Sequence, residues 1–215
     1  MSKRAPSAPK GSRSVAESRR GPQRVVAFAG SLRRGSFNRA LVEAARGLAP
    51  DGMTIVPIEI GDLPFYNADV EDMGDPPAVT AFKTALCEAD GVLISTPEYN
   101  DGMPGVLTNA IDWGSRLPAN APLTGKPVAL MGASPSQVGT ARAQLHLRQL
   151  LGHVRARILP PPELLVATAH QQFDAELRLT HDGTRRLLVA LLERFARWIA
   201  RERAARAAER EMVES

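Results

Sequence analysis

The sequence predicts a single α/β domain in which helices cover both faces of a doubly wound, five-stranded parallel sheet. Short apolar, β-branched runs alternate along the chain with segments of helical periodicity. Strands that are buried on both faces have this continuous apolar character. The alternation implies parallel strands joined by right-handed crossovers. With 215 residues, 44% of them apolar, the chain can bury one sizeable core.

Each predicted element rests on its own local pattern. The first strand is the apolar run at residues 24–29, and helical spacing of apolar residues begins at Asn38. The other strands are predicted at residues 53–57, 91–95, 127–132 and 155–159. The other helices are predicted at residues 77–89, from Pro104 onward, at 139–151 and at 185–212. In the last helix an apolar stripe is expected to face the core, made of Leu187, Leu188, Leu191, Leu192, Phe195 and Trp198.

The two ends of the chain differ in composition from the middle. Residues 1–22 are rich in Ser, Pro, Gly and Arg, lack an apolar signal-peptide core, and are predicted to be a disordered basic tail. Residues 23–200 form the predicted domain, and residues 201–215 a charged helical extension. The tail holds six basic residues and one acidic residue, so the remainder of this +4 chain is nearly neutral. A solvated extension is favoured over a polyanion-binding arm, and no nucleic-acid partner is expected.

Residue counts argue against several kinds of site. Cys87 is the only cysteine, which precludes an intramolecular disulfide, and its place in a predicted helix favours packing in the core. The histidines, at positions 146, 153, 170 and 181, lack metal-ligand spacing, so no metal is expected. No run of about 18 apolar residues exists, so we expect no membrane span and a cytoplasmic protein.

The loop after the first predicted strand has the composition of an anion site. It reads Gly30-Ser31-Leu32-Arg33-Arg34-Gly35-Ser36-Phe37-Asn38. It opens a helix, whose N-terminus favours a phosphate through free N–H groups and the helix dipole, and its side chains add donors that suit a phosphate monoester. The loop matches neither the G-x-G-x-x-G nor the P-loop pattern, which argues against Rossmann-type and NTPase sites. A capped helix without a ligand is the alternative.

A second polar loop follows the third predicted strand. It reads Thr96-Pro97-Glu98-Tyr99-Asn100-Asp101-Gly102-Met103-Pro104-Gly105. Both loops follow the carboxyl ends of strands, so they are expected on the sheet edge where open α/β folds bind ligands. Tyr99 offers an aromatic surface to a planar ring, and Glu98, Asn100 and the amides of residues 100–102 offer polar groups to its rim. An unliganded turn is the alternative, but together the two loops indicate a flavin mononucleotide site.

These motifs resemble those of the NADPH-dependent FMN reductase family. The resemblance rests on Gly-Ser-Leu-Arg at 30–33 with Ser36 and Asn38, on residues 97–100, and on residues 104–113. It covers roughly residues 23–200 and implies a flavodoxin-like fold with strand order 2-1-3-4-5. It also implies FMN as cofactor, NADPH or NADH as co-substrate, and a small-molecule electron acceptor: a quinone, free flavin, an azo compound or a metal oxyanion.

The resemblance assigns site residues one by one. The family's phosphate-binding residues fall on Ser31, Arg33, Ser36 and Asn38, and its ring-side loop falls on Pro97, Glu98, Tyr99 and Asn100. A serine-containing turn after the fourth strand adds Ser134. Two departures are visible: Val138 replaces the first glycine of a Gly-Gly pair, and Asp101-Gly102-Met103 replaces the more usual Gly-Ser-Ile or Gly-Ser-Met.

The implied reaction is hydride transfer from the nicotinamide to flavin N5, followed in ping-pong order by reduction of the acceptor. The flavin needs no side chain as acid or base, so no catalytic residue is predicted. A flavodoxin-like electron carrier and a non-catalytic, flavin-binding regulatory protein are the alternatives. Arg33, Arg34 and Arg116 are candidates for recognising the 2′-phosphate of NADPH, but each has an equally good role elsewhere.

The family resemblance also implies a homodimer or homotetramer. Its members place the second flavin loop and the following helix close to a neighbouring subunit. Trp113, with Asp112 and Arg116, is therefore expected either at an interface or in the core of one subunit.

Overall fold

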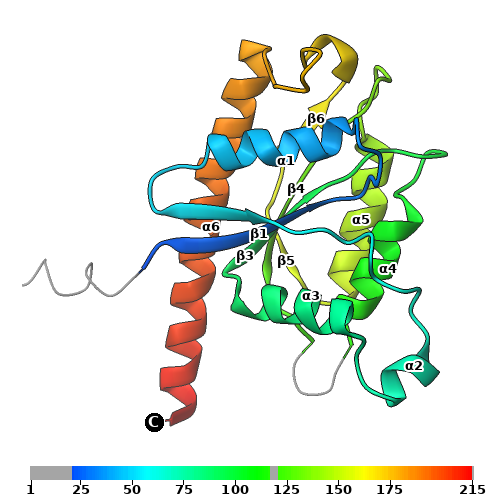
Figure 1. The fold of residues 1–215 in the computed structure, drawn as a ribbon. Coiled ribbons are helices and arrows are strands. Elements are labelled where there is room, and N and C mark those ends of the chain that lie inside the picture. Colours follow the sequence, from blue (N-terminus) through cyan, green and yellow to red (C-terminus); the bar gives the residue numbers. More distant parts are fainter. Residues whose placement is uncertain (1–20, 117–120, 215) are drawn as a thin grey trace, which may run out of the picture.

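The computed structural model describes residues 21–116 and 121–214. The predicted tail over residues 1–22 lies outside the described residues, apart from Gly21 and Pro22. In the described chain the strands form one parallel sheet of order β2-β1-β3-β4-β5, with β6 also paired to β4 (Figure 1). The predicted strand order is confirmed, and a sixth strand is added.

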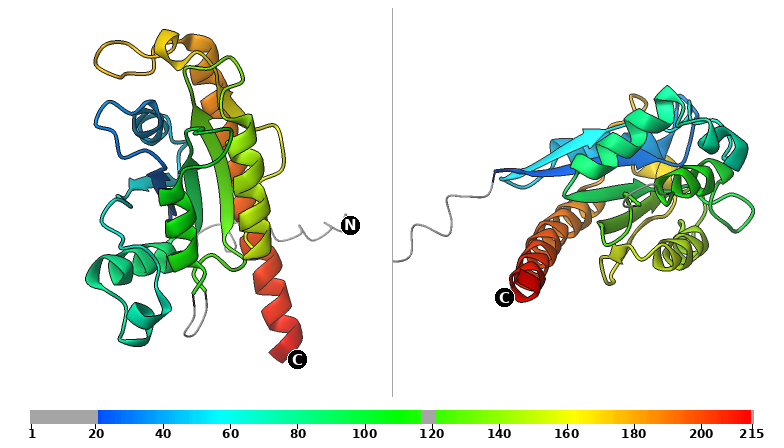
Figure 2. Two further views of the ribbon diagram at one scale, coloured as in Figure 1. Left: turned by 90° about the vertical axis from the view of Figure 1, so that its right-hand side faces the viewer. Right: turned by 90° about the horizontal axis from the view of Figure 1, so that it is seen from below.

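The strands are β1 (Gln23–Ala29), β2 (Met53–Pro57), β3 (Gly91–Ser95), β4 (Pro127–Ala133), β5 (Arg157–Ile158) and β6 (Leu164–Val166). The helices are α1 (Phe37–Gly47), α2 (Ala68–Asp72), α3 (Pro77–Glu88), α4 (Gly105–Gly114), α5 (Ala141–His153) and α6 (Asp182–Glu214). A short 3₁₀ helix, η1, spans Ala169–Gln171. Residues 201–214 continue α6, whose C-terminal end projects beyond the sheet (Figure 2).

Each face of the sheet has its own apolar core, because alternate side chains of a strand point to opposite faces. On one face, Val25 and Leu93 pack with α1 and α6. On the other, Val26 and Ile94 pack with α3, α4 and α5. The central strands are therefore apolar at successive positions, which is why the sequence shows them as continuous runs.

The fifth strand differs from its prediction. A single strand was expected at residues 155–159, but the structure has two short strands, β5 and β6, that pair with different parts of β4. The three prolines at positions 160–162 separate them, because proline has no N–H to donate to a sheet. The guanidinium group of Arg194 donates hydrogen bonds to the carbonyl oxygens of all three prolines.

Two side chains predicted to be buried are exposed. Leu187 is 61% exposed, and Ile199 completes the buried stripe of α6 instead, because Leu187 lies off the face shared by Leu188 and Leu192. Cys87 is also exposed, since its neighbour Leu86 occupies the core-facing position of α3.

Candidate functional site

Three loops begin side by side at the carboxyl edge of the sheet. Ala29 at the end of β1 is in register with Ser95 at the end of β3, and Ser95 is in register with Met131 of β4. The chain leaves these strands into loops at residues 30–36, 96–104 and 134–140. The Tyr99 hydroxyl lies 3.3 Å from Oγ of Ser31, to which it donates a hydrogen bond, so the first two loops are in contact.

The first loop has the properties of an anion-binding site. The backbone N–H groups of residues 31–35 form no hydrogen bond with a described protein group. Ser31 and Ser36 are both buried, and Oγ of Ser36 caps α1 by accepting from the Arg39 N–H at 3.3 Å. Arg33 is exposed, so its guanidinium charge is accessible to a ligand. A run of free N–H groups at a helix N-terminus, next to hydroxyls and a guanidinium, fits the phosphate of FMN.

Gly30 allows this loop to lie close to α4. A Cβ atom at Gly30 would be 2.5 Å from Cδ1 of Leu107 on α4. Real Cβ atoms do not approach other carbon atoms so closely. The absence of a side chain at Gly30 therefore allows the loop to lie this close to α4.

Asn38 connects the first loop to the neighbouring strands. Its buried Oδ1 accepts hydrogen bonds from the Ser95 hydroxyl and the Ala133 N–H, both at 2.9 Å. Its Nδ2 donates to the Ala133 carbonyl oxygen at 2.8 Å. The carboxamide thus holds the start of α1 against the ends of β3 and β4, which leaves one N–H of Nδ2 for any other partner.

The second loop folds into a two-residue hairpin turn. Tyr99 and Gly102 exchange backbone hydrogen bonds at 2.9 and 3.0 Å, with Asn100 and Asp101 between them at φ of 49° and 58°. Asn and Asp adopt this left-handed conformation more readily than other side chains, and a turn with two positive φ values needs it twice. The Gly102 amide is used within the turn, so of the three amides considered for the flavin rim, those of Asn100 and Asp101 remain free.

Glu98 anchors the hairpin to α5. Its side chain is 7% exposed and accepts hydrogen bonds from the backbone N–H groups of Arg142 and Ala143 at 2.9 and 3.1 Å. The Arg142 guanidinium bridges Glu98 and Asp101, at 3.2 and 2.7 Å. The carboxylate therefore stabilises the N-terminus of α5. The same bridge explains the acidic residue at position 101, which lies where the family usually has none.

The third loop is shaped by Ser134. Its Oγ accepts a hydrogen bond from the Ser136 N–H at 3.2 Å, and its backbone N–H donates to the Val166 carbonyl oxygen at 3.0 Å. Gly139 keeps a positive φ of 68°, whereas Val138 is 47% exposed. The replacement of the first glycine therefore places an apolar side chain on the surface of this loop.

Of the predicted residues, the structure brings Ser31 and Tyr99 into contact, and Ser36 caps the helix that follows the same loop. Asn38, Glu98 and Ser134 fix the loops around them. Pro97 is buried, and Asn100 is exposed at the tip of the hairpin. Sequence reasoning missed the roles of Arg142 and Ser95. Their partners are 41 to 57 residues away in the chain, so no local pattern marks them.

Trp113 lies in the core rather than on the surface of the subunit. It is fully buried, and its indole N–H donates to the Pro64 carbonyl oxygen at 2.8 Å. Arg116 stacks on the Tyr66 ring at 4.4 Å, and a hydrogen bond from the Tyr66 hydroxyl to Glu71 raises the pKa of the tyrosine. Burial raises the pKa of Asp112, which the Arg116 charge partly opposes.

The doubly wound sheet, with three polar loops at its carboxyl edge, defines a ligand-binding α/β protein of the flavodoxin-like fold. Residues 23–171 match the model of the NADPH-dependent FMN reductase family, and the chain belongs to that family. FMN and NAD(P)H are accordingly its cofactor and co-substrate, and the protein is an oxidoreductase.

Individual relatives agree with this assignment. The NAD(P)H-dependent FMN reductase PA1204 of Pseudomonas aeruginosa is 46% identical over 180 residues, covering 84% of this chain and 97% of the relative. A 2-hydroxy-1,4-benzoquinone reductase of a Burkholderia species is 39% identical over 176 residues, covering 82% and 96%. The structure of FerB, a flavoenzyme NAD(P)H:(acceptor) oxidoreductase from Paracoccus denitrificans, superimposes with a TM-score of 0.77 at 34% identity, covering 84% and 98%.

No helix within residues 21–116 and 121–214 is long and apolar enough to cross a membrane. Among the same residues, no group of three or more His, Cys, Asp or Glu side chains is arranged to hold a metal ion.

Proposed function

We propose that the FMN phosphate binds in the first loop and that the flavin ring lies against the hairpin of the second. The observation that carries this proposal is the run of unpartnered N–H groups at residues 31–35, in contact with Tyr99 through Ser31. Ser31, Arg33 and Ser36 would hold the phosphate. Asn38, Glu98 and Ser134 act as positioning residues, because their polar groups are bonded to the loops and strands around the site.

When bound, FMN supplies the redox chemistry, by accepting a hydride from NAD(P)H and then reducing a second substrate in ping-pong order. The chain's own part is to bind and orient. The free amides of Asn100 and Asp101, and the N-terminus of α4, provide positive electrostatic potential at this edge of the sheet. Such fixed dipoles favour negative charge on a bound group, and no side chain has to transfer a proton.

We propose a quinone as the electron acceptor. The Burkholderia relative is a 2-hydroxy-1,4-benzoquinone reductase, and it aligns with 82% of this chain. Free flavin, azo compounds and metal oxyanions remain the other acceptors to compare in the same assay.

The experiment is to purify the protein with FMN, record its visible spectrum, and follow NADPH and NADH oxidation with a quinone. A bound-flavin spectrum with rapid quinone-dependent turnover is the expected result. Bound flavin without turnover would favour an electron carrier. A folded protein that binds no flavin would favour a regulatory role and overturn the placement of the site.

Substitutions test the placement separately. The Arg33→Ala, Ser36→Ala double variant should bind FMN at least about tenfold more weakly, because it loses a charge-assisted contact and a hydroxyl donor. Tyr99→Ala should alter the flavin spectrum and turnover. The control is Arg197→Ala on α6, which removes one arginine from an exposed pair with Glu193. Unchanged FMN affinity in the double variant would remove the phosphate assignment.

We further propose that the protein is a homodimer or homotetramer in the cytoplasm. The segment between β2 and α3 supports the assembly, because it exposes two large apolar side chains, Phe65 at 85% and Met73 at 81%. Hydrogen bonds from Asn109 and Trp113 to Pro64 hold this segment in place, so the exposed side chains are presented on a fixed surface. Light scattering should give a dimer or tetramer that Phe65→Ser shifts toward monomer, and a monomeric wild type would contradict this.

A further inference from the structure

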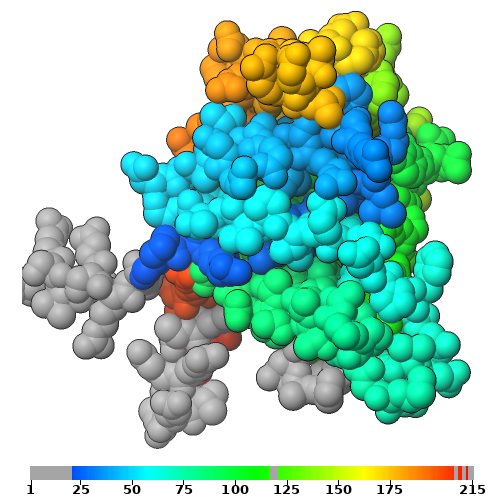
Figure 3. All heavy atoms as spheres, in the orientation of Figure 1, coloured from blue at the N-terminus to red at the C-terminus, as the bar shows by residue number. Residues whose placement is uncertain are grey.

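A groove extends from the phosphate loop along α1. Its volume is about 590 Å³, and it lies between α1 and the segment that precedes α6. In Figure 3 that segment, coloured yellow to orange, lies directly beside the blue to cyan α1. Ser36 lines one end of the groove, which is therefore continuous with the proposed FMN site. Grooves of this size accept a small ligand or part of a cofactor.

The walls of the groove combine apolar surface with arginines. One side of α1 contributes Ala40 and Ala44, and the facing segment contributes Leu177 and Leu179. Ala44 and Leu177 are only partly buried, and they offer an apolar surface on which a flat base can lie. Arginine side chains also line the groove, and a guanidinium group is well suited to binding a phosphate.

Two of the arginines carry charge that no described carboxylate neutralises. Arg34 forms no hydrogen bond or ion pair with a described group. The Arg185 guanidinium donates one hydrogen bond at 3.0 Å to the carbonyl oxygen of Leu179, a neutral acceptor. By contrast, the groove's other charged side chains are already paired. Those pairs are Arg39 with Glu59, Glu43 with Arg46, and Glu176 with Arg178.

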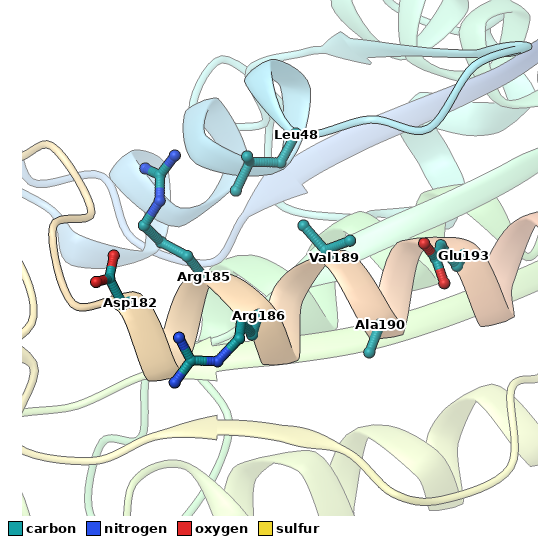
Figure 4. Close-up of a pocket in the computed structure, with 7 residues that line it drawn as sticks. All are labelled: Leu48, Asp182, Arg185, Arg186, Val189, Ala190 and Glu193. Carbon is teal, nitrogen blue, oxygen red and sulfur yellow. The ribbon is translucent and has the colours of Figure 1, made fainter.

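The direction of the side chains distinguishes Arg185 from its neighbour. Figure 4 shows Arg185 reaching from α6 toward α1, on the same side as Leu48, whereas Arg186 points away from α1. Leu48 and Arg185 also line a second hollow of about 390 Å³ that continues the groove along α6. Arg186 lines only that second hollow, so it serves as a matched control for Arg185.

We propose that this groove binds the adenosine 2′-phosphate end of NADPH, with Arg34 and Arg185 contacting the phosphate. NADPH is longer than FMN, so we place its nicotinamide over the flavin ring and its adenosine end in the groove that opens at Ser36, beside the phosphate loop. Of the three arginines that the sequence left open, Arg34 alone lines the groove, and Arg116 is stacked on Tyr66. The proposal rests on the FMN placement given above and makes NADPH the preferred co-substrate.

The test compares the two nicotinamides in holoenzyme with a quinone acceptor. In Arg185→Ala and in Arg34→Ala, the ratio of KM for NADPH to KM for NADH should rise about tenfold or more, because a charge-assisted contact to the 2′-phosphate is lost. Arg186→Ala, which removes the same charge from the next residue, should leave that ratio unchanged. Equal KM ratios in the wild type and in all three variants, or an equal rise of that ratio in Arg186→Ala, would overturn the proposal.

A binding measurement separates this proposal from the proposed function. Calorimetry with 2′-AMP and 5′-AMP requires no turnover and no electron acceptor. Tighter binding of 2′-AMP, lost in both Arg34→Ala and Arg185→Ala, would support the groove even if the enzyme used another acceptor. Equal affinity for the two nucleotides would overturn the groove while the FMN site stood. Loss of FMN binding in Arg33→Ala, Ser36→Ala concerns the flavin placement alone.

Discussion

The side-chain amide of Asn38 pairs with both backbone groups of Ala133. Its Oδ1 accepts from the Ala133 N–H at 2.9 Å, and its Nδ2 donates to the Ala133 carbonyl oxygen at 2.8 Å. This pair spans β3 and joins the start of the first helix to the end of β4. The loop proposed to hold the phosphate is therefore fixed to the centre of the sheet before any ligand binds.

Replacing Asn38 should destabilise the whole domain. Asn38→Ala leaves the Ala133 N–H and carbonyl groups buried without their partner, which costs about 2–4 kcal/mol of unfolding free energy. Urea denaturation followed by circular dichroism measures the loss. The control is Gln149→Ala on the exposed face of α5, where a change within about 0.5 kcal/mol is expected. A variant as stable as the wild type would show that these bonds contribute nothing to stability.

Glu98→Gln should loosen the N-terminus of α5. The neutral amide oxygen accepts the Arg142 and Ala143 N–H groups less strongly than a carboxylate, so we expect a loss of about 1–2 kcal/mol. Hydrogen exchange of the first turn of α5 should accelerate more than that of its last turn. Glu193→Gln, which weakens an exposed pair with Arg197, should have little effect. A uniform change along α5 would argue against a capping role for Glu98.

Two glycines should respond to alanine in opposite directions. A Cβ atom at Gly132 on β4 would overlap Oγ1 of Thr140 and the backbone oxygen of Thr96, which cannot move without distorting β3. Gly132→Ala should therefore destabilise the protein by about 3 kcal/mol or more. Gly47 ends α1 with no heavy atom within 4 Å of such a Cβ, so Gly47→Ala should stabilise it by about 0.5–1 kcal/mol. Thermal unfolding of both variants measures the two changes. If Gly132→Ala were as stable as Gly47→Ala, the close approach at Gly132 would be unimportant for stability.

Acid should release the segment that forms one wall of the groove. Hydrogen bonds from the Arg178 backbone, with further contributions from its side chain and from the Glu176 N–H, lower the pKa of Asp174. The folded state therefore favours the carboxylate. Its stabilising effect is present above the ordinary aspartate pKa of about 3.9 and is lost as the pH falls through the lower folded value.

The measurement is hydrogen exchange at the Arg178 amide between neutral pH and pH values below about 4. Protection should fall on acidification after correction for the intrinsic rate. In Asp174→Asn, which has no carboxylate to titrate, that pH dependence should disappear. A wild-type profile identical to that of the variant would show that the Asp174 charge does not hold the segment.

The central strands were predictable because each is buried on both faces and so appears as one apolar run, whereas their order rested on the family resemblance. β5 and β6 are two and three residues long, too short to show any period, and the prolines between them hid their relation to β4. The two flavin loops were recognisable from composition. The role of Glu98 was not, because its partner Arg142 is 44 residues away and only the fold brings them together. Similarly, Leu187 and Leu188 are indistinguishable by composition, and the exact phase of α6 decides which one is buried.

The interrupted strand beyond β4 also affects how the protein behaves at high concentration. An uninterrupted edge strand offers a row of free N–H and carbonyl groups on which another chain can add a strand. Here the edge consists of two short pieces, the prolines between them have no N–H, and Arg194 already occupies their carbonyl oxygens. This flank of the sheet is thus a poor template for fibre growth, and α6, which carries Arg194, lies against it.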